Sequence, residues 1–401
     1  MSAPGHTAAS LAGSPNSLAA HYTRFRVSER LLLTGHSHQA WPDVGFEAQQ
    51  QAWLDAAELI DDKWSRAHEQ ADAVRLGFAR LLGDPRGSIA LAGNTHELVV
   101  RFLSALPLAE RPRILTSDGE FHTLRRQLDR LAETGRIEVV KLAASPATDL
   151  AARAALAVDS RTAAVCVSSV LFGNAHLVPG LGELANACGR HGAELLVDAY
   201  HQIGVVPMDL GRAGLDRAFV VGGGYKYCQL GEGNCFLRVP PGREDLSPVV
   251  TGWYSEFARL AESPAGSAPY GVGAARWAGA TYDPSSHYRA ARVFAFFEEQ
   301  ALSPTLLRQV SQHQVSRLAE RFDALDLDPA RLARDRGTPL EQIGGFLALR
   351  GDRAGEFSAA LRTLGVWTDS RGSTLRLGPA PYLSDAQLDQ AIGLLGEVVR
   401  A

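Results

Sequence analysis

The chain has 401 residues, enough for a large domain and a smaller one. Its composition, 46% hydrophobic and 21% charged, is ordinary for a globular enzyme, and its net charge of -4 gives no electrostatic case for nucleic acid or an anionic membrane. It contains no apolar run of the length that spans a membrane, and its four cysteines lack metal-like spacing. We therefore expect a reduced, cytoplasmic protein with no nucleic-acid or membrane partner.

The N-terminal region divides into a tail, a loop and a long helical pattern. Residues 1–18 are rich in Ser, Ala, Gly and Pro and lack a basic start, so we expect a flexible tail. The following loop carries His36, Ser37 and His38, and residues 44–82 show a helical apolar pattern. The two histidines alternate as metal ligands can, but no third ligand has useful spacing, so loop or pocket roles are favoured over a metal site.

Three short apolar strands then end in polar residues. The strand at 88–94 runs into Asn94 and Thr95, which can cap the next helix, and free amides at a helix N-terminus favour a phosphate, although a cap alone is commoner. The strand at 113–116 leads to Phe121, and the strand at 163–168 is followed by Ser169. Strand–helix–strand units at this spacing predict right-handed crossovers and a mostly parallel sheet flanked by helices.

Two further strands carry the most informative residues. The strand at 193–197 ends in Asp198, and the strand at 217–221 ends in three glycines followed by Tyr225 and Lys226. Singly, such residues are often a helix cap or a loop charge, and Tyr227 after Lys226 excludes a P-loop. Together they suit pyridoxal phosphate (PLP), which needs a Lys for a Schiff base and a carboxylate for its pyridine nitrogen. Since ligands bind at the carboxyl ends of parallel strands, we predict a PLP site here.

The C-terminal part predicts a second domain. Residues 251–284 are rich in Gly and aromatic residues and contain Trp253 and Thr281, and a long helix over 288–300 leads to an α+β region. Arg376 lies inside a short strand, where alternation alone could point it to solvent, but a functional role is favoured. We expect a large domain over residues 45–285 and a small domain formed by 19–44 plus 286–401.

The combination of Asp198, His201 three residues later and Tyr225-Lys226 resembles the class V aminotransferase group of PLP enzymes. The resemblance runs from about Leu31 to the C-terminus, and within the group it is most similar to kynureninase. It implies fold type I, an α/β fold with a seven-stranded, mostly parallel sheet in the large domain and a smaller α+β domain.

The resemblance also implies roles for individual residues. The cofactor phosphate would be held by Asn94, Thr95, Tyr225 and Trp253, with Thr281 reaching the phosphate of a partner subunit although it lies one residue out of place. The ring would contact Phe121 by stacking, with His122 as the alternative, and His201 and Ser169 at its polar edge. Arg376 would bind the substrate carboxylate, a task suited to a planar bidentate donor. His36 and Ser37 would contact the substrate from their loop. Two departures stand out: the family has Asn where this chain has His36, and an Asp where it has Leu124.

The implied activity is hydrolytic Cβ–Cγ cleavage of kynurenine or a relative, giving alanine and an aromatic acid, in a homodimer with shared active sites. In the implied chemistry Lys226 is the base at Cα, Asp198 pairs with the ring and Tyr225 relays protons. Alternatives are a class V aminotransferase, a carbon–sulfur lyase, and a catalytically silent PLP-fold binder. A persulfide-forming desulfurase is disfavoured because no cysteine follows Cys235.

Overall fold

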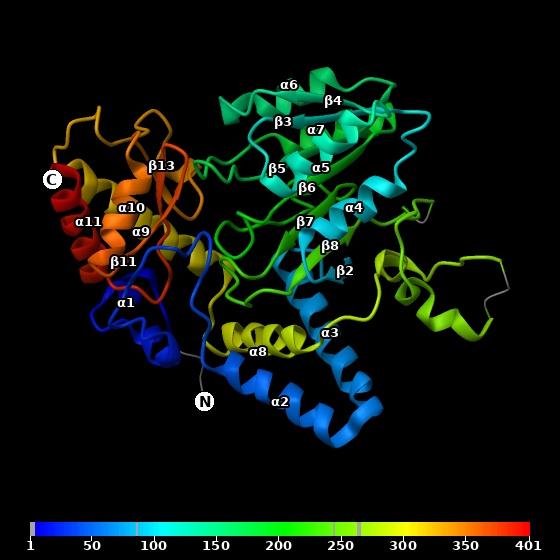
Figure 1. The fold of residues 1–401 in the computed structure, drawn as a ribbon, viewed down its shortest axis with the longest axis horizontal. Coiled ribbons are helices and arrows are strands. Elements are labelled where there is room, and N and C mark those ends of the chain that lie inside the picture. The colour runs from blue at the N-terminus through cyan, green and yellow to red at the C-terminus, as the bar shows by residue number, and fades with distance from the viewer. Residues whose placement is uncertain (1–4, 86, 244, 263–265) are drawn as a thin grey trace.

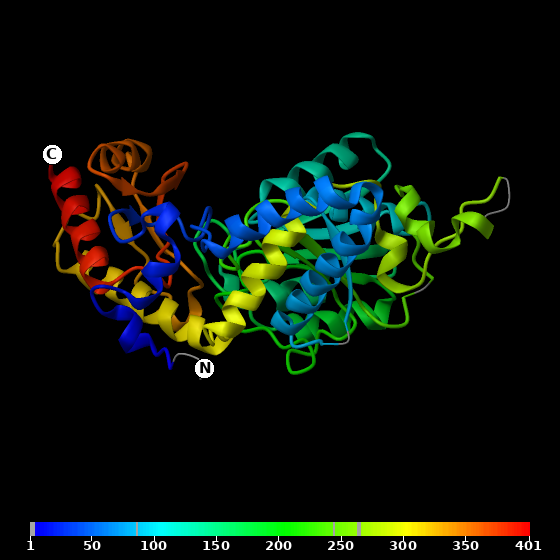
Figure 2. The same cartoon turned by 90° about the horizontal axis from the view of Figure 1, so that it is seen from below.

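The computed structural model describes residues 5–85, 87–243, 245–262 and 266–401, which form two lobes lying side by side (Figures 1 and 2). The larger lobe is built on a seven-stranded sheet in the order β2-β8-β7-β6-β5-β3-β4, in which β8 runs in the opposite direction to the other six strands. The α/β class and the mostly parallel sheet expected from the sequence are thus confirmed. Its strands are β2 Ser88–Ala92, β3 Arg113–Ser117, β4 Glu138–Leu142, β5 Thr162–Ser168, β6 Glu194–Asp198, β7 Phe219–Gly223 and β8 Cys235–Val239.

Helices cover both faces of this sheet because consecutive side chains of each strand point to opposite faces. On β6, for example, Leu195 packs in one apolar cluster and Leu196 in the other. The helices of this lobe are α2 Val44–Leu59, α3 Lys63–Leu81, α4 Thr95–Ala105, α5 His122–Glu133, α6 Leu150–Ala157, α7 Leu181–His191 and α8 Ser285–Glu299, with 3-10 turns η3 Ile60–Asp62, η4 Ala147–Asp149, η5 Trp253–Glu262 and η6 Gly273–Trp277.

The smaller lobe joins the two ends of the chain. Its four-stranded antiparallel sheet has the order β12-β13-β10-β9, and β1 near the N-terminus pairs in parallel with β11. The elements are α1 Ala8–Ala12, β1 Leu31–Leu32, α9 Pro304–Asp323, β9 Ala333–Arg334, β10 Leu347–Arg350, α10 Ala354–Thr363, β11 Val366–Trp367, β12 Asp369–Arg371, β13 Thr374–Leu377 and α11 Asp385–Arg400, with 3-10 turns η1 Ser17–His21, η2 Thr23–Phe25 and η7 Leu340–Gln342.

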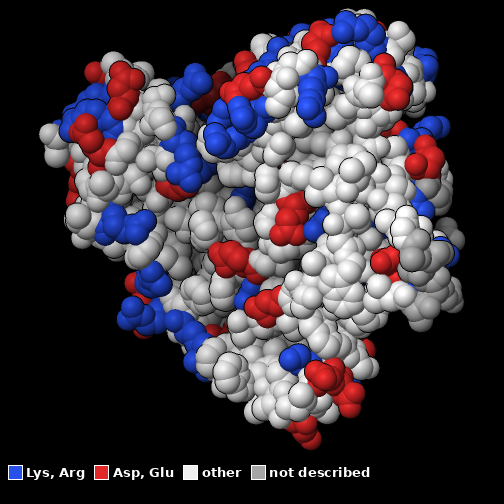
Figure 3. All heavy atoms as spheres, turned by 45° about the vertical axis from the view of Figure 1, so that its right-hand side comes forward, with Lys and Arg blue, Asp and Glu red and all other residues white. Residues whose placement is uncertain are grey.

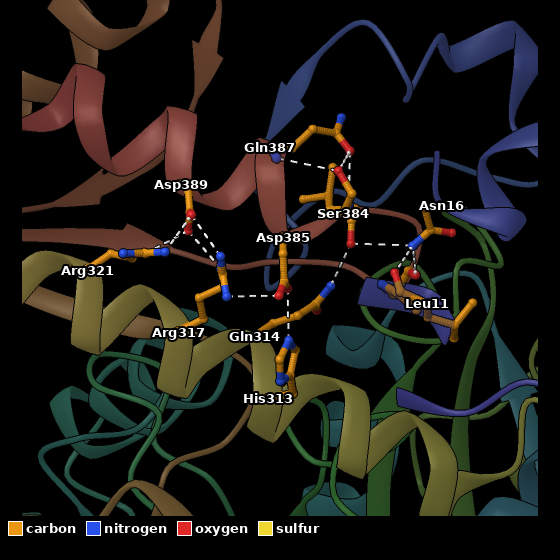
Figure 4. Close-up of polar contacts among 12 residues, drawn as sticks. Leu11, Asn16, His313, Gln314, Arg317, Arg321, Ser384, Asp385, Gln387 and Asp389 are labelled. Carbon is orange, nitrogen blue, oxygen red and sulfur yellow. Dashed lines mark hydrogen bonds and ion pairs between the residues drawn. The ribbon is translucent and has the colours of Figure 1, made fainter. Parts of the chain in front are cut away.

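Part of the tail expected over residues 1–18 packs on the smaller lobe, while residues 1–4 lie outside the described part. Leu11 and Leu18 are buried in the small-lobe core. The Asn16 amide donates to the Leu11 and Pro381 carbonyls at 2.6 and 2.9 Å (Figure 4). Two widely spaced leucines among small residues are too weak a pattern to reveal such packing from sequence.

The helix that follows the expected domain boundary at residue 286 packs with the larger lobe. Helix α8 packs against α2 and α3 beneath the large sheet (Figure 1). Its Arg289 lies against Gly45 of α2, and its Phe294 lies against Gly77 of α3. The large lobe therefore extends through α8, and the smaller lobe resumes near α9.

Basic and acidic residues are interspersed over both lobes on the face shown in Figure 3. Within the described ranges, none of the helices combines the length and the apolar character needed to cross a bilayer.

Candidate active site

A pocket of about 360 Å³ opens at the carboxyl ends of β5 and β6 and at the loop after β7. This volume lies within the usual range for small-molecule sites. Seven of the residues singled out from the sequence line it: Asn94, Thr95, Phe121, Asp198, His201, Tyr225 and Lys226. The pocket thus gathers residues from five separate parts of the large lobe.

Lys226, one of only three lysines in the chain, lies buried at 5% exposure in this pocket. Burial lowers the pKa of its amine to about 7, although nearby Asp198 opposes the shift. The glycines before it are required because a Cβ on Gly223 would collide with the Tyr200 hydroxyl and Cys235. A substantial fraction of the amine is therefore neutral at physiological pH.

Asp198 ends β6 beside the strand that leads to Lys226. Its Oδ1 accepts a hydrogen bond from the Tyr200 backbone amide at 2.9 Å. Burial raises the pKa of this carboxyl, while that hydrogen bond and the charge of Lys226 lower it. The carboxylate remains open to the pocket and can pair with a cation there.

His201 lies directly against the amine. Its Nε2 is 2.8 Å from Lys226 Nζ, while its buried Nδ1 has no hydrogen-bond partner in the protein. Burial and then the charge of Lys226 lower the pKa of this imidazole well below its usual value. A neutral ring can donate or accept at the pocket wall.

The far end of the pocket is rich in hydrogen-bond donors. Asn94 caps α4, its Oδ1 accepting from the Glu97 amide at 3.0 Å, and Thr95 at the start of this helix lines the pocket. Burial raises the pKa of Tyr225 to about 12, so its phenol stays protonated. Its ring stacks on His38, with centroids 5.4 Å apart. These donors suit an anion such as a phosphate.

Aromatic rings close the side of the pocket. Lys226 Nζ lies 4.4 Å from the Tyr200 ring centroid and 5.4 Å from that of Phe121. Phe121 meets Phe172 edge to face at 5.3 Å, and His122 also packs on Phe172. Of the two candidates for a stacking ring, Phe121 lines the pocket and His122 does not.

Three other sequence candidates lie outside the pocket. Ser169 donates from its amide and its hydroxyl to the Asp198 carbonyl at 2.9 and 3.3 Å, and Ser168 lines the pocket instead. Trp253, 43% exposed on η5, packs on Tyr254 and not on the pocket. Thr281 lines a separate groove of about 1230 Å³, which adjoins the pocket at Gly233.

The candidates for substrate contact form a second layer towards the small lobe. Arg376 is buried, donating from Nε and Nη2 to Asp369 Oδ1 at 3.0 and 2.7 Å and from Nη1 to the Phe172 carbonyl at 2.8 Å. His36 is fully buried against Phe346, and neither ring nitrogen has a partner. Burial, followed by the charge of Arg376, lowers its pKa well below the usual value.

Ser37 and Leu124 both lie outside the pocket. Ser37 turns its hydroxyl to the Thr34 carbonyl at 3.1 Å, within its own loop. Leu124 is buried with Leu128 on the apolar face of α5, in the same cluster as Leu98 of α4. Thr123 lines the pocket instead. The absent Asp therefore reflects a helix face that is turned into the core.

Sequence reasoning missed Glu120, Ser168, Phe172 and Tyr200. Glu120 and Tyr200 are the sequence neighbours of the predicted residues Phe121 and His201, so the sequence already placed them near the expected site. Only the structure shows that the Glu120 side chain turns inward, where it accepts hydrogen bonds from Ser117 and Ser168 at 2.5 Å each.

Comparison with known proteins agrees with this geometry. No family model matches the chain. Over 202 residues it is 31% identical to an isopenicillin N epimerase of Streptomyces clavuligerus, covering 49% of this chain and 48% of that one. It is 24% identical over 353 residues to the uncharacterized aminotransferase YcbU of Bacillus subtilis (85% and 87%), and 29% identical over 267 residues to a kynureninase of Pseudomonas fluorescens (62% and 61%). The chain thus spans about half the length of the epimerase that it matches.

Solved structures confirm the fold. A mutant of C-DES with glycine covalently linked to its PLP cofactor superposes with a TM-score of 0.83 at 16% identity, covering 94% of this chain and 99% of that one. A cysteine desulfurase from Thermococcus onnurineus superposes with a TM-score of 0.80 at 15% identity over the whole of both chains. These findings confirm fold type I and the resemblance to class V aminotransferase-like PLP enzymes.

Proposed function

We propose that this chain, a PLP-dependent enzyme of the class V aminotransferase-like group, hydrolyses the Cβ–Cγ bond of kynurenine or a close relative. The observation that carries the cofactor is the pairing of a buried, partly neutral Lys226 with Asp198 in one ligand-sized pocket. The products would be alanine and an aromatic acid, since the oxygen of one water molecule enters the acid and Cβ gains a proton.

The residues present fit PLP. Lys226 supplies the amine for the aldehyde, and the Asp198 carboxylate suits the pyridine nitrogen. His201 Nδ1 has no hydrogen-bond partner in the protein, and the contact of His201 Nε2 with Lys226 Nζ can be replaced by one with the cofactor. The ring can therefore bind the polar edge of the cofactor. The helix terminus at Asn94 and Thr95, together with the Tyr225 phenol, suits the phosphate.

When bound, PLP supplies an electron sink for charge that develops at Cα of an amino acid. Lys226 Nζ, whose pKa is lowered to about 7 by burial, is suited to take the Cα proton and return it later. His201 Nε2, 2.8 Å away, orients that amine. Phe121 and Tyr200 restrict water near the reacting atoms by covering the pocket with apolar rings.

Arg376 is the candidate for the substrate carboxylate. Asp369 and Phe172 occupy its Nε side and one Nη1 hydrogen, which leaves the outer Nη1–Nη2 edge for a bidentate partner. Phe172 connects this arginine to the aromatic wall, because its carbonyl holds Arg376 while its ring lines the pocket. An aromatic substrate side chain fits this surrounding better than a small thiol side chain does.

The cysteines argue against persulfide chemistry. All four are buried, and burial raises the pKa of Cys188, Cys228 and Cys235 to about 12 and that of Cys166 still further. A sulfur acceptor needs an accessible thiolate. Aminotransfer remains an outcome that the experiment below distinguishes from hydrolysis.

We also propose a homodimer. The large groove lined by Thr281 adjoins the pocket, and apolar side chains of the same region, such as Val272 at 87% exposed and Trp253 at 43%, lie on the surface. Burial of such side chains in a second copy would place η5 and η6 near the partner's phosphate end. Light scattering of the cofactor-loaded protein tests this directly.

The test of activity is an absorbance spectrum after reconstitution with PLP, followed by addition of kynurenine or 3-hydroxykynurenine and product analysis. We expect a cofactor band, then equimolar alanine and aromatic acid. A band without alanine, but with conversion of the cofactor to its amine form by amino donors, would identify an aminotransferase instead. Failure to bind PLP would contradict the proposal entirely.

A further inference from the structure

Glu120 is a buried acidic residue behind the pocket wall, bonded to the pocket residue Ser168, and the proposed chemistry leaves it unused. It lies in the loop between β3 and α5, directly before Phe121, yet its side chain is only 2% exposed. Its two carboxyl oxygens accept hydrogen bonds from the Ser117 and Ser168 hydroxyls, at 2.5 Å each. A carboxyl group in a loop would normally reach water. Here it is held inward from two different strands.

Ser168 connects Glu120 to the strand position beside Asp198. Ser168, which donates to Glu120, is the register partner of Asp198 across β5 and β6 and lines the pocket. Burial raises the pKa of Glu120 to about 7, the two serine hydroxyls oppose the rise, and Asp198 adds to it. The other titratable group that faces it is the buried Cys166 thiol of β5. In the described ranges, no Lys, Arg or His forms an ion pair with Glu120.

Packing alone does not require an acid at this position. A glutamine would accept a hydrogen bond through its carbonyl oxygen without the cost of burying a charge. A carboxyl group instead offers a negative charge that can form when a cation arrives nearby. The cation expected here is the protonated pyridine ring that pairs with Asp198.

We propose that Glu120 is a second anionic support for the cofactor ring, protonated below neutral pH in the cofactor-free protein and losing its carboxyl proton to solvent when a protonated ring pairs with Asp198. It is a positioning residue, acting through Ser168 and through the charge of Asp198. The inference rests on PLP as the cofactor. It predicts that PLP binding is coupled to release of one proton from Glu120 near neutral pH.

The pH dependence has a definite sign. At about pH 5.5 Glu120 is protonated with or without cofactor and resembles glutamine, so Glu120→Gln should leave the PLP dissociation constant nearly unchanged. At about pH 8.5 the carboxylate is available to the ring cation, so the same substitution should weaken PLP binding by about tenfold. A purely structural role would change affinity by the same factor at every pH.

The experiment titrates PLP into the cofactor-free wild type, Glu120→Gln, Ser117→Ala and Glu133→Gln between these two pH values. Glu133→Gln removes an exposed charge on α5 and should keep a constant affinity ratio to wild type, whereas Ser117→Ala removes a hydrogen bond that lowers the pKa of Glu120 and should move the pH dependence to higher pH. A ratio for Glu120→Gln that rises with pH supports the proposal, and a constant ratio overturns it. If the wild type does not bind PLP, the proposed function fails as well.

A second measurement does not depend on how Glu120→Gln folds. Infrared difference spectra of the wild type labelled with ¹³C-glutamate should lose a protonated carboxyl band when PLP is added near pH 6.5. A labelled band that is unchanged by PLP would overturn the inference while leaving cofactor binding intact.

Discussion

The pocket region and the seam between α9 and α11 use charged residues in opposite ways. Lys226 in the pocket and Glu120 behind it are buried, and desolvation moves the pKa of each towards the value that favours its neutral form. In the α9–α11 seam, formed by His313, Arg317, Arg321, Asp385 and Asp389, the charges are partly exposed and directly paired (Figure 4).

The seam stabilises charge by geometry. Arg317 grips Asp389 with two hydrogen bonds of 2.7 Å, and Arg321 adds a third at 3.0 Å. Burial alone would raise the pKa of Asp389, but the two arginines lower it. Paired charges keep a domain together, whereas the unpaired, desolvated groups of the pocket remain available for proton transfer and for ligand charge.

The largest expected effect is that of removing the amine from the pocket. Lys226→Ala should abolish the PLP absorbance band and lower turnover by about 10³-fold or more, because both the anchor and the base at Cα are lost. The control is Lys141→Ala, whose ammonium pairs with Asp129 on the surface. Equal losses of activity in Lys226→Ala and Lys141→Ala would contradict a specific role for the buried amine.

The same residue should govern the pH dependence of cofactor-free stability. The pKa of Lys226 is lowered to about 7 in the fold, so above that pH the unfolded chain binds one more proton than the native protein. The free energy of unfolding should therefore rise with pH from about 7 to about 10, by at most about 1.4 kcal/mol per pH unit for this group. In urea unfolding, the Lys226→Met variant should lack the part of the rise in unfolding free energy with pH that Lys226 contributes. An unchanged slope would mean that the amine stays charged when buried.

Arg376 combines features of both regions, because it is buried like the pocket groups and paired like the seam. Arg376→Lys keeps the charge but loses the planar fork, so KM for the amino-acid substrate should rise by about 10- to 100-fold. The cofactor band should be unchanged. A shifted band with unchanged KM would place Arg376 in the scaffold rather than at the substrate.

The smallest expected effect is in the seam. Asp389→Asn should lower the free energy of unfolding by about 0.5–1 kcal/mol, since the side chains are partly exposed and screened. Because the folded pKa of Asp389 is depressed, this contribution is present above the pKa of the unfolded state and is lost as pH falls through the lower folded value. Thermal unfolding at pH 7 and at low pH measures it, and PLP affinity should not change.

The sequence was informative where chemistry restricts residue type and spacing. Asp198 and Lys226 follow buried strands, and the rule that parallel strands share a carboxyl edge brought them together correctly. The sequence was less informative where either of two neighbouring side chains could point into the pocket, as with Ser168 and Ser169. Glu120 could not be placed from sequence because an acid in a loop normally faces water, and only the packing of β3 against β5 turns it inward.

The most direct test of the central claim is to trap PLP on the protein with borohydride and map the labelled lysine by mass spectrometry. The chain has only Lys63, Lys141 and Lys226 as candidates, so the assignment is unambiguous. We predict one PLP group per chain, on Lys226, that is absent from Lys226→Ala and retained in Lys141→Ala. Labelling of Lys63 or Lys141 instead, or no label on any lysine, would contradict the account.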